Sequence, residues 1–284
     1  MQEMQSTNPV LSRPDAWQVD TTQPQYGQGQ QYQGQPYQGY PQQGQQPYGY
    51  TDANAPQFGQ PGQVAGRMTI DDVITKSAIT LGVLVAVAGL TFLFLPTALI
   101  FPVWIVTAIV SFGAAMLVAA RRKVNPGFVL VYAAIEGVFI GAISKAYESL
   151  WDGIVPAAVL GTLVAAAATL AAYKFFRIKV TDKFRKMVMI GTIAYAGVLL
   201  VNLVLSLFGI GNIFASANIG LLLLISAIGV GLAVFNLILD FDFIEQGIAM
   251  GAASSESWRA AFGLTVTMVW LYIEMLRLLS YFRR

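Results

Sequence analysis

The apolar residues of this chain are concentrated after residue 66, in seven long runs that short polar or charged stretches separate. Each run is close to the roughly 20 residues that an α-helix needs to cross the hydrocarbon core of a bilayer. The pattern therefore predicts an all-α polytopic membrane protein, with a bundle of seven transmembrane helices in residues 67–284. The predicted helices lie at about 75–95, 98–120, 127–147, 154–176, 186–208, 217–240 and 258–281.

Residue types at the ends of the runs support this division. Thr69 precedes the first run as an N-cap, and Asp71 and Asp72 follow in the first turn, where the helix dipole favours acids. Pro126 and Pro156 fall at the starts of the third and fourth runs, where proline is tolerated. We therefore expect helices to begin at these positions.

Residues 1–66 differ in composition from the rest. From Gln23 to Gln63 the segment consists largely of Gln, Gly, Pro and Tyr, and no lysine or arginine lies between Arg13 and Arg67. Without periodic apolar residues, ordering the segment would cost backbone entropy without burial in return. We predict a disordered cytoplasmic tail, either inert or using its tyrosines for weak association or partner docking. It has no apolar core of the kind that a signal peptide needs.

Lysine and arginine predict the orientation. The loops after the first and fifth runs carry neither, and the loop after the third carries only Lys145. The positive-inside rule then places the even-numbered loops and the tail on the cytoplasmic side of the cell membrane, and the C-terminus on the outside. Arg283 and Arg284 at the C-terminus oppose the rule, so a re-entrant last segment is the alternative to seven full crossings. The cytoplasmic charges are Arg121, Arg122, Lys123, Lys174, Arg177, Lys179, Lys183, Arg185 and Lys186.

The composition narrows the chemistry. The formal net charge of +2 gives no electrostatic support to nucleic-acid binding. Cysteine and histidine are absent, which removes thiolate metal sites, histidine-dependent catalysis and the usual pH-sensing side chain. Carboxylates within the apolar runs are therefore the remaining groups for proton chemistry. A charge at mid-bilayer costs about 2.5–3.5 kcal/mol, so acids there usually pair, bind a cation or take up a proton.

Glu136 lies near the middle of the third predicted helix. Tyr132 and Ser144 share its helix face, so this face should look into the bundle. The carboxyl group is either a proton or cation station or a structural group that hydrogen-bonds a neighbouring helix. Gly137 and Gly141 form a GxxxG spacing in the same run, which favours close helix packing but indicates no function.

Acids also occur near the last two predicted helices. Asp240 and Asp242 close the sixth run; two residues apart, they point to roughly opposite sides, and we expect Asp240 to turn inward. Asp242 shares a face with Glu245, and we expect both to be solvated at a helix end. Glu274, in the last run, is three residues before Arg277, so an intrahelical ion pair would explain it.

Three segments carry a resemblance to a known family. They are IEGVFIGAIS in the third run, ILDFDFIEQG at the end of the sixth and LYIEMLRLLSYF in the last. In this order they resemble the Bax inhibitor-1/YccA family of membrane proteins, bacterial branch. The likeness covers roughly residues 67–284, excludes the tail, and implies a seven-helix bundle with a central last helix.

The resemblance also implies a function and a site. Family members are associated with a pH-sensitive calcium leak, and a pair of aspartates on the last two helices shares a proton and gates the pore. Asp240 matches the first of the pair. The second position is Glu274 if LYIE is aligned with the family's LYLD, or Thr267 if the C-terminal ends are aligned without a gap. In the second alignment the pair is broken or moved outward by two turns.

Two functions follow as expectations. The first is a leak for calcium or protons in which Asp240, Glu136 and Glu274 bind the ion. Asp242 and Thr267 are weaker candidates for binding it. Calcium is placed at Asp240, because calcium prefers oxygen ligands. The second is a regulatory protein that binds a membrane protease or envelope partner through its tail, with structural acids. We expect no enzyme and no resident cofactor, since histidine and a GxGD motif are absent.

Overall fold

The structure confirms the seven predicted helices. The computed structural model describes residues 66–176, 178–209 and 217–283, so the predicted tail lies outside the described residues apart from Gly66. All seven helices are long and apolar enough to cross a membrane. They are α1 Ile70–Phe94, α2 Ile100–Ala119 after the short 3-10 helix η1 Thr97–Leu99, α3 Pro126–Glu148, α4 Ile154–Phe175, α5 Asp182–Leu207, α6 Ile219–Ala249 and α7 Glu256–Phe282.

The helix starts predicted after Thr69 and at Pro126 are confirmed, and Pro156 lies in the first turn of α4, which begins at Ile154. The Thr69 hydroxyl accepts a hydrogen bond from the backbone N–H of Asp72 at 3.2 Å, as an N-cap does. Asn125 caps α3 by accepting from the N–H of Gly127 at 2.8 Å, and Pro126 occupies the first helical position. Short polar segments thus set the entry of each of these helices into the membrane.

The predicted end of the sixth helix near residue 240 is wrong, because α6 continues to Ala249. The two aspartates lie inside the helix, and Asp242 is held there by a partner on another helix. The helix stops where Gly251 adopts a φ of 66°, the left-handed conformation that glycine accepts at helix ends. Hydropathy falls at the aspartates, and the prediction therefore ended the helix there. A carboxylate does not strongly disfavour a helix, so α6 continues past them.

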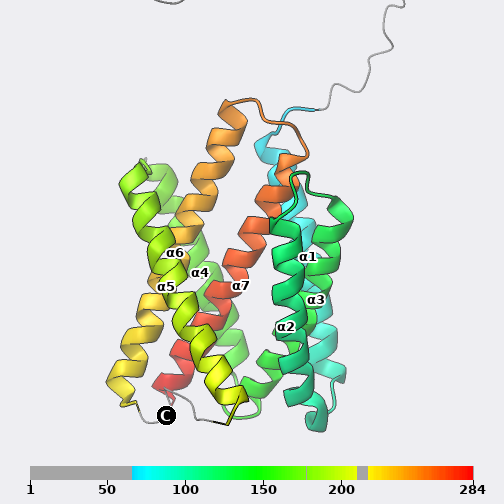
Figure 1. Ribbon diagram of the computed structural model, residues 1–284, viewed down its shortest axis with the longest axis vertical. Coiled ribbons are helices and arrows are strands. Elements are labelled where there is room, and N and C mark those ends of the chain that lie inside the picture. Colours follow the sequence, from blue (N-terminus) through cyan, green and yellow to red (C-terminus); the bar gives the residue numbers. More distant parts are fainter. Residues whose placement is uncertain (1–65, 177, 210–216, 284) are drawn as a thin grey trace, which may run out of the picture. The chain divides into compact units, whose positions relative to one another are not determined.

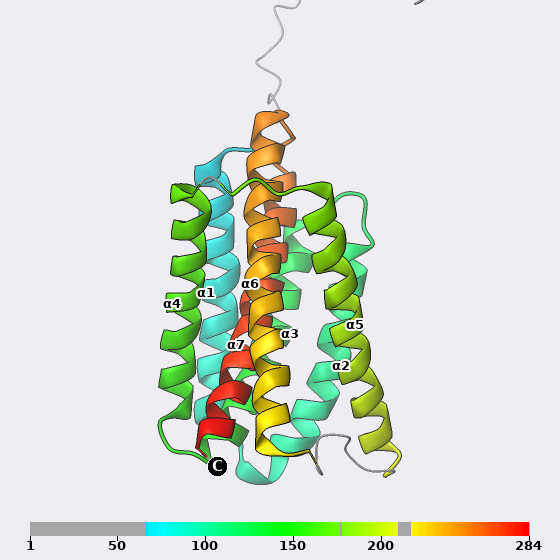
Figure 2. The same ribbon diagram turned by 90° about the vertical axis from the view of Figure 1, so that its left-hand side faces the viewer.

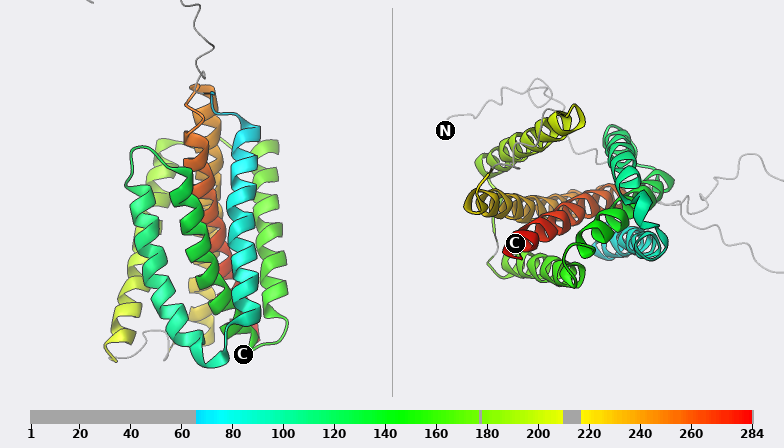
Figure 3. Two further views of the ribbon diagram at one scale, coloured as in Figure 1. Left: turned by 90° about the vertical axis from the view of Figure 1, so that its right-hand side faces the viewer. Right: turned by 90° about the horizontal axis from the view of Figure 1, so that it is seen from below.

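Helix α7 lies at the centre of the helical unit (Figures 1 and 3). It packs against α6, α1, α4 and α3, which agrees with the expected central last helix. Helix α2 packs mainly on α3, and α5 packs on α6, so both lie at the periphery (Figure 2). Helix α7 runs the full length of the unit, as a crossing helix does and a re-entrant segment does not.

The outward faces of the helices are apolar. Phe101 and Phe112 on α2, Val164 on α4 and Ile190 on α5 are each about two-thirds exposed. Such surfaces suit lipid, in which apolar side chains need no cover. The protein is thus a multi-pass membrane protein surrounded by a bilayer.

Hydrogen bonds to loop backbone connect the segments at both ends of the unit. Gly66 and Met68 form hydrogen bonds with the loop between α6 and α7, and Lys76 donates to the Ser254 carbonyl at 2.8 Å. At the opposite end Arg283 donates to the carbonyl oxygens of Asp152 and Gly153. Arg283, one of the two C-terminal charges that oppose the positive-inside rule, is thus bound by the loop between α3 and α4.

Candidate functional site

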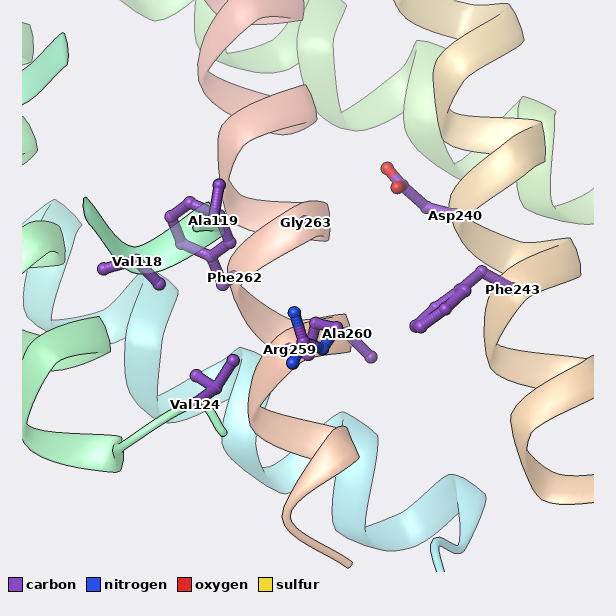
Figure 4. Close-up of a pocket in the computed structure, with 9 residues that line it drawn as sticks. All are labelled: Val118, Ala119, Val124, Asp240, Phe243, Arg259, Ala260, Phe262 and Gly263. Atoms are coloured by element: carbon purple, nitrogen blue, oxygen red, sulfur yellow. The ribbon is translucent and has the colours of Figure 1, made fainter. Parts of the chain in front are cut away.

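The Asp240 carboxylate lies at a cavity of about 270 Å³ near the joined ends of α6 and α7. Figure 4 shows Asp240 and Phe243 projecting from α6 toward α7, with Asp240 directed toward the turn that carries Gly263. The predicted inward direction of Asp240 is consistent with this placement. The other walls consist of Val118, Ala119, Val124, Arg259, Ala260 and Phe262.

The Asp240 side chain borders the cavity, and one of its carboxylate oxygens lacks a hydrogen-bond donor among the described residues. Its Oδ2 atom is enclosed and accepts no hydrogen bond from the described part of the chain. The Thr267 side chain, buried on α7, is a neighbouring hydrogen-bond donor to the carboxyl group. A Cβ atom on Gly263 would lie 3.3 Å from Asp240 Oδ1, so glycine leaves the space that the carboxylate uses.

Arg259, the cationic residue of the cavity wall, is bound elsewhere. Its Nε atom pairs with Glu256 at 2.7 Å, and Nη2 donates to the Arg122 carbonyl at 2.8 Å. Asp240 takes part in none of the ion pairs between described residues. An enclosed carboxylate oxygen without a counter-charge is the kind of group that binds a proton or a cation.

Asp242 differs from its prediction, whereas Glu245 agrees with it. Asp242 is only 9% exposed, and its Oδ2 accepts from Arg185 of α5 at 2.8 Å and from Gln246 at 2.7 Å. It is therefore a paired group that ties α5 to α6 and not a solvated charge. Glu245 is exposed and accepts from the Tyr173 hydroxyl of α4 at 2.6 Å.

Glu136 is buried between α2 and α3, with 6% of its surface exposed. The Ser111 hydroxyl of α2 donates to its Oε2 atom, and Tyr132, one turn earlier, directs its hydroxyl to the same carboxyl group. Ser144 is buried on the same face and bonds the Tyr272 hydroxyl at 2.7 Å. The predicted inward face of this helix is confirmed, and the carboxyl group bonds a neighbouring helix, as the structural interpretation expects.

Glu274 forms the predicted pair with Arg277 and belongs to a larger cluster. Arg277 Nη1 lies 2.9 Å from Glu274 Oε1 and 3.1 Å from the Tyr195 hydroxyl of α5. Trp270 stacks on the Tyr195 ring, and its Nε1 atom lies 3.4 Å from Glu274 Oε1. Glu274 itself is 1% exposed. The sequence pattern missed Tyr195, because nothing in α5 marks it as the partner of a residue 79 positions later.

The three carboxylates do not share one site. The Asp240 cavity is lined by neither Glu136 nor Glu274. Asp240 lies opposite Gly263 and Glu274 opposite Gly229, so the two acids are separated along α6 by eleven residues, or about 16 Å at 1.5 Å per residue. Within the described ranges no group of three or more acids could hold a metal ion. Among these three described acids, Asp240, with Thr267 beside it, is therefore the one that lines this cavity.

Comparison with known proteins relates the chain to one family. A family model described as Bax inhibitor 1 like matches residues 8–284. The match begins in the N-terminal tail, well before the 67–284 region in which the sequence motifs lie. No curated protein matches the chain.

Proposed function

The chain belongs to the Bax inhibitor 1 like family, and we propose that this integral membrane protein leaks cations, calcium among them, along a path that starts at Asp240. The observation that carries the proposal is the enclosed, unpartnered Oδ2 atom of Asp240 beside an open cavity. A single carboxylate and a hydroxyl provide fewer oxygens than the six to eight that a tight calcium site uses. Weak binding of this kind suits passage, because a permeating ion must leave as well as enter.

The described conformation is a closed one. On the α6 face that follows Asp240 toward the other end of the membrane, Leu237 and Ala233 are almost completely buried. An ion at Asp240 would meet packed side chains, so conduction requires α6 and α7 to separate. Protonation of Asp240 removes the charge that attracts the ion, which makes the proposed leak increase with pH.

We expect Asp240→Asn to lower calcium flux into proteoliposomes by about tenfold or more, because the lost Coulomb partner is worth over about 1.4 kcal/mol at close range. The remaining flux should no longer depend on pH, since an amide does not titrate. Flux measured with a trapped calcium dye from pH 6 to pH 8 checks this. Glu245→Gln, an exposed carboxylate on the same helix, is the matched control and should leak like the wild type.

Equal leak in Asp240→Asn and the wild type at every pH would contradict the proposal. That outcome would favour a regulatory protein that binds a membrane protease or envelope partner. Deletion of residues 1–66 separates the two functions further, because a leak through the helical unit survives the deletion and tail-dependent partner binding does not.

We also propose that the protein lies in the cell membrane with the Asp240 end of the unit on the cytoplasmic side. The loop that carries Arg121, Arg122 and Lys123 is continuous with Val124 of the cavity wall, and cytoplasmic loops are enriched in such residues. The chain has no cysteine, so single cysteines can report the topology. An impermeant maleimide should label Asp152→Cys in intact cells and Lys123→Cys only after permeabilisation; the reverse pattern would invert the assignment.

A further inference from the structure

The interface between α6 and α7, here called the seam, contains an acidic side chain at two positions, one in each half of the membrane. These positions are called the two polar points. Asp240 meets α7 at Gly263, and Glu274 meets α6 at Gly229. Eleven residues separate the two points on each helix, so the antiparallel register is the same at both, and they lie about 16 Å apart. An ion that enters at Asp240 and follows this seam therefore meets Glu274 and Arg277 in the far half of the membrane.

The second polar point leaves no space for an ion in the described conformation. A Cβ atom on Gly229 would lie 2.4 Å from the Tyr195 hydroxyl and 2.6 Å from Glu274 Oε2. The carboxylate and the hydroxyl are thus packed directly onto the α6 backbone, and the guanidinium of Arg277 is hydrogen-bonded to both of them. This glycine is needed at its position because any side chain would displace the cluster.

Arg277 places a permanent positive charge at this point. Its guanidinium does not lose its proton in proteins, and 23% of its side chain remains exposed although Glu274 is 1% exposed. A buried ion pair is a weak source of stability, so its presence inside a membrane helix needs another reason. Ser226 lies one turn from Gly229 on α6 and, in the same register, opposite Arg277. Its hydroxyl is buried and has no partner among the described residues.

We infer that Arg277, held by Glu274 and Tyr195, is the charge barrier that closes the outer half of the cation path to calcium and other cations. The pair with Glu274 keeps the guanidinium on the seam, and the contact with Tyr195 of α5 joins α5, α6 and α7 at the same point. A fixed arginine in a narrow path repels cations electrostatically. This inference rests on the proposed function and names the residue that keeps the leak small.

The test compares full-length variants in proteoliposomes with a calcium dye and a potassium-selective readout. Glu274→Gln combined with Arg277→Gln removes both charges and keeps similar side-chain shapes. We expect flux to rise by about tenfold, the change that corresponds to lowering a barrier by about 1.4 kcal/mol. Glu274→Leu with Arg277→Met is the second variant if the first fails to fold. Asp72→Asn with Lys76→Gln neutralises another intrahelical pair, on α1, and should leave flux unchanged.

The outcomes separate this inference from the proposed function. If Asp240→Asn lowers flux but the charge-free variants leak like the wild type, the barrier is disproved and the Asp240 path stands. If Asp240→Asn has no effect but the charge-free variants leak more, the entry site is wrong and the barrier stands. If neither change alters flux, both are overturned. Combining Asp240→Asn with a charge-free variant should reduce the raised flux again when both are correct.

Discussion

Replacing Glu274 alone by leucine should destabilise the helical unit by about 3 kcal/mol. Removal of one partner of a buried ion pair typically costs about 3–5 kcal/mol, because the other charge is left uncompensated. The lower end applies because Arg277 is 23% exposed and keeps the Tyr195 hydroxyl at 3.1 Å. At roughly 2–4 °C per kcal/mol for a domain of this size, the apparent melting temperature in detergent should fall by about 6–12 °C.

The double variant Glu274→Leu with Arg277→Met is the control for this loss. It removes both charges together and replaces them with apolar side chains that a membrane protein interior accepts. Its melting temperature should return most of the way to the wild-type value. If the single and double variants melt at the same temperature, the loss comes from packing and not from an unpaired guanidinium.

Replacing Gly141 by leucine should disrupt the contact between α1 and α3. A Cβ atom at this position would lie 2.5 Å from the Ala88 carbonyl oxygen and 2.6 Å from Thr91 Cβ. Backbone cannot move aside as a flexible side chain does, so the cost should reach about 3 kcal/mol, the upper end of ordinary overpacking. Gly137 has a similar contact, 2.6 Å from the Leu84 carbonyl oxygen, and Gly137→Leu should act in the same direction.

Gly113→Leu provides the matched control on α2, where a Cβ atom meets nothing within 4 Å. It adds the same side chain to a membrane helix and gains the same helix propensity. Thermal unfolding of the purified variants in one detergent compares them directly. An equal melting temperature for Gly141→Leu and Gly113→Leu would show that α1 and α3 are not in close contact at this point.

Much of the fold could be predicted from local sequence. The span of a membrane helix depends on the number of consecutive apolar residues, which the chain itself states, and all seven helices were found in this way. Caps such as Thr69 act within three residues, so they are visible without a structure. The Glu274–Arg277 pair and the inward face of Glu136 also follow from helical spacing within one element.

The remaining contacts join residues that are far apart in the chain. Asp242 stays buried inside α6 because Arg185, 57 residues earlier, binds it. Ser111 bonds Glu136 across 25 residues, and Tyr195 meets Arg277 across 82. No periodic pattern encodes such pairs, because lipid gives no hydrophobic drive that would mark one helix face for one particular partner.

The amino-acid sequence by itself determined that this protein crosses a membrane seven times, and it identified the acids that such a membrane makes costly. Only the tertiary structure decided what surrounds each acid: Asp240 faces a cavity without a counter-charge, Asp242 ties α5 to α6, and the Glu274–Arg277 pair meets Tyr195 of α5. The reason is physical. Insertion depends on hydropathy summed along one segment, whereas the role of a buried charge depends on the atoms that packing brings within about 3 Å of it.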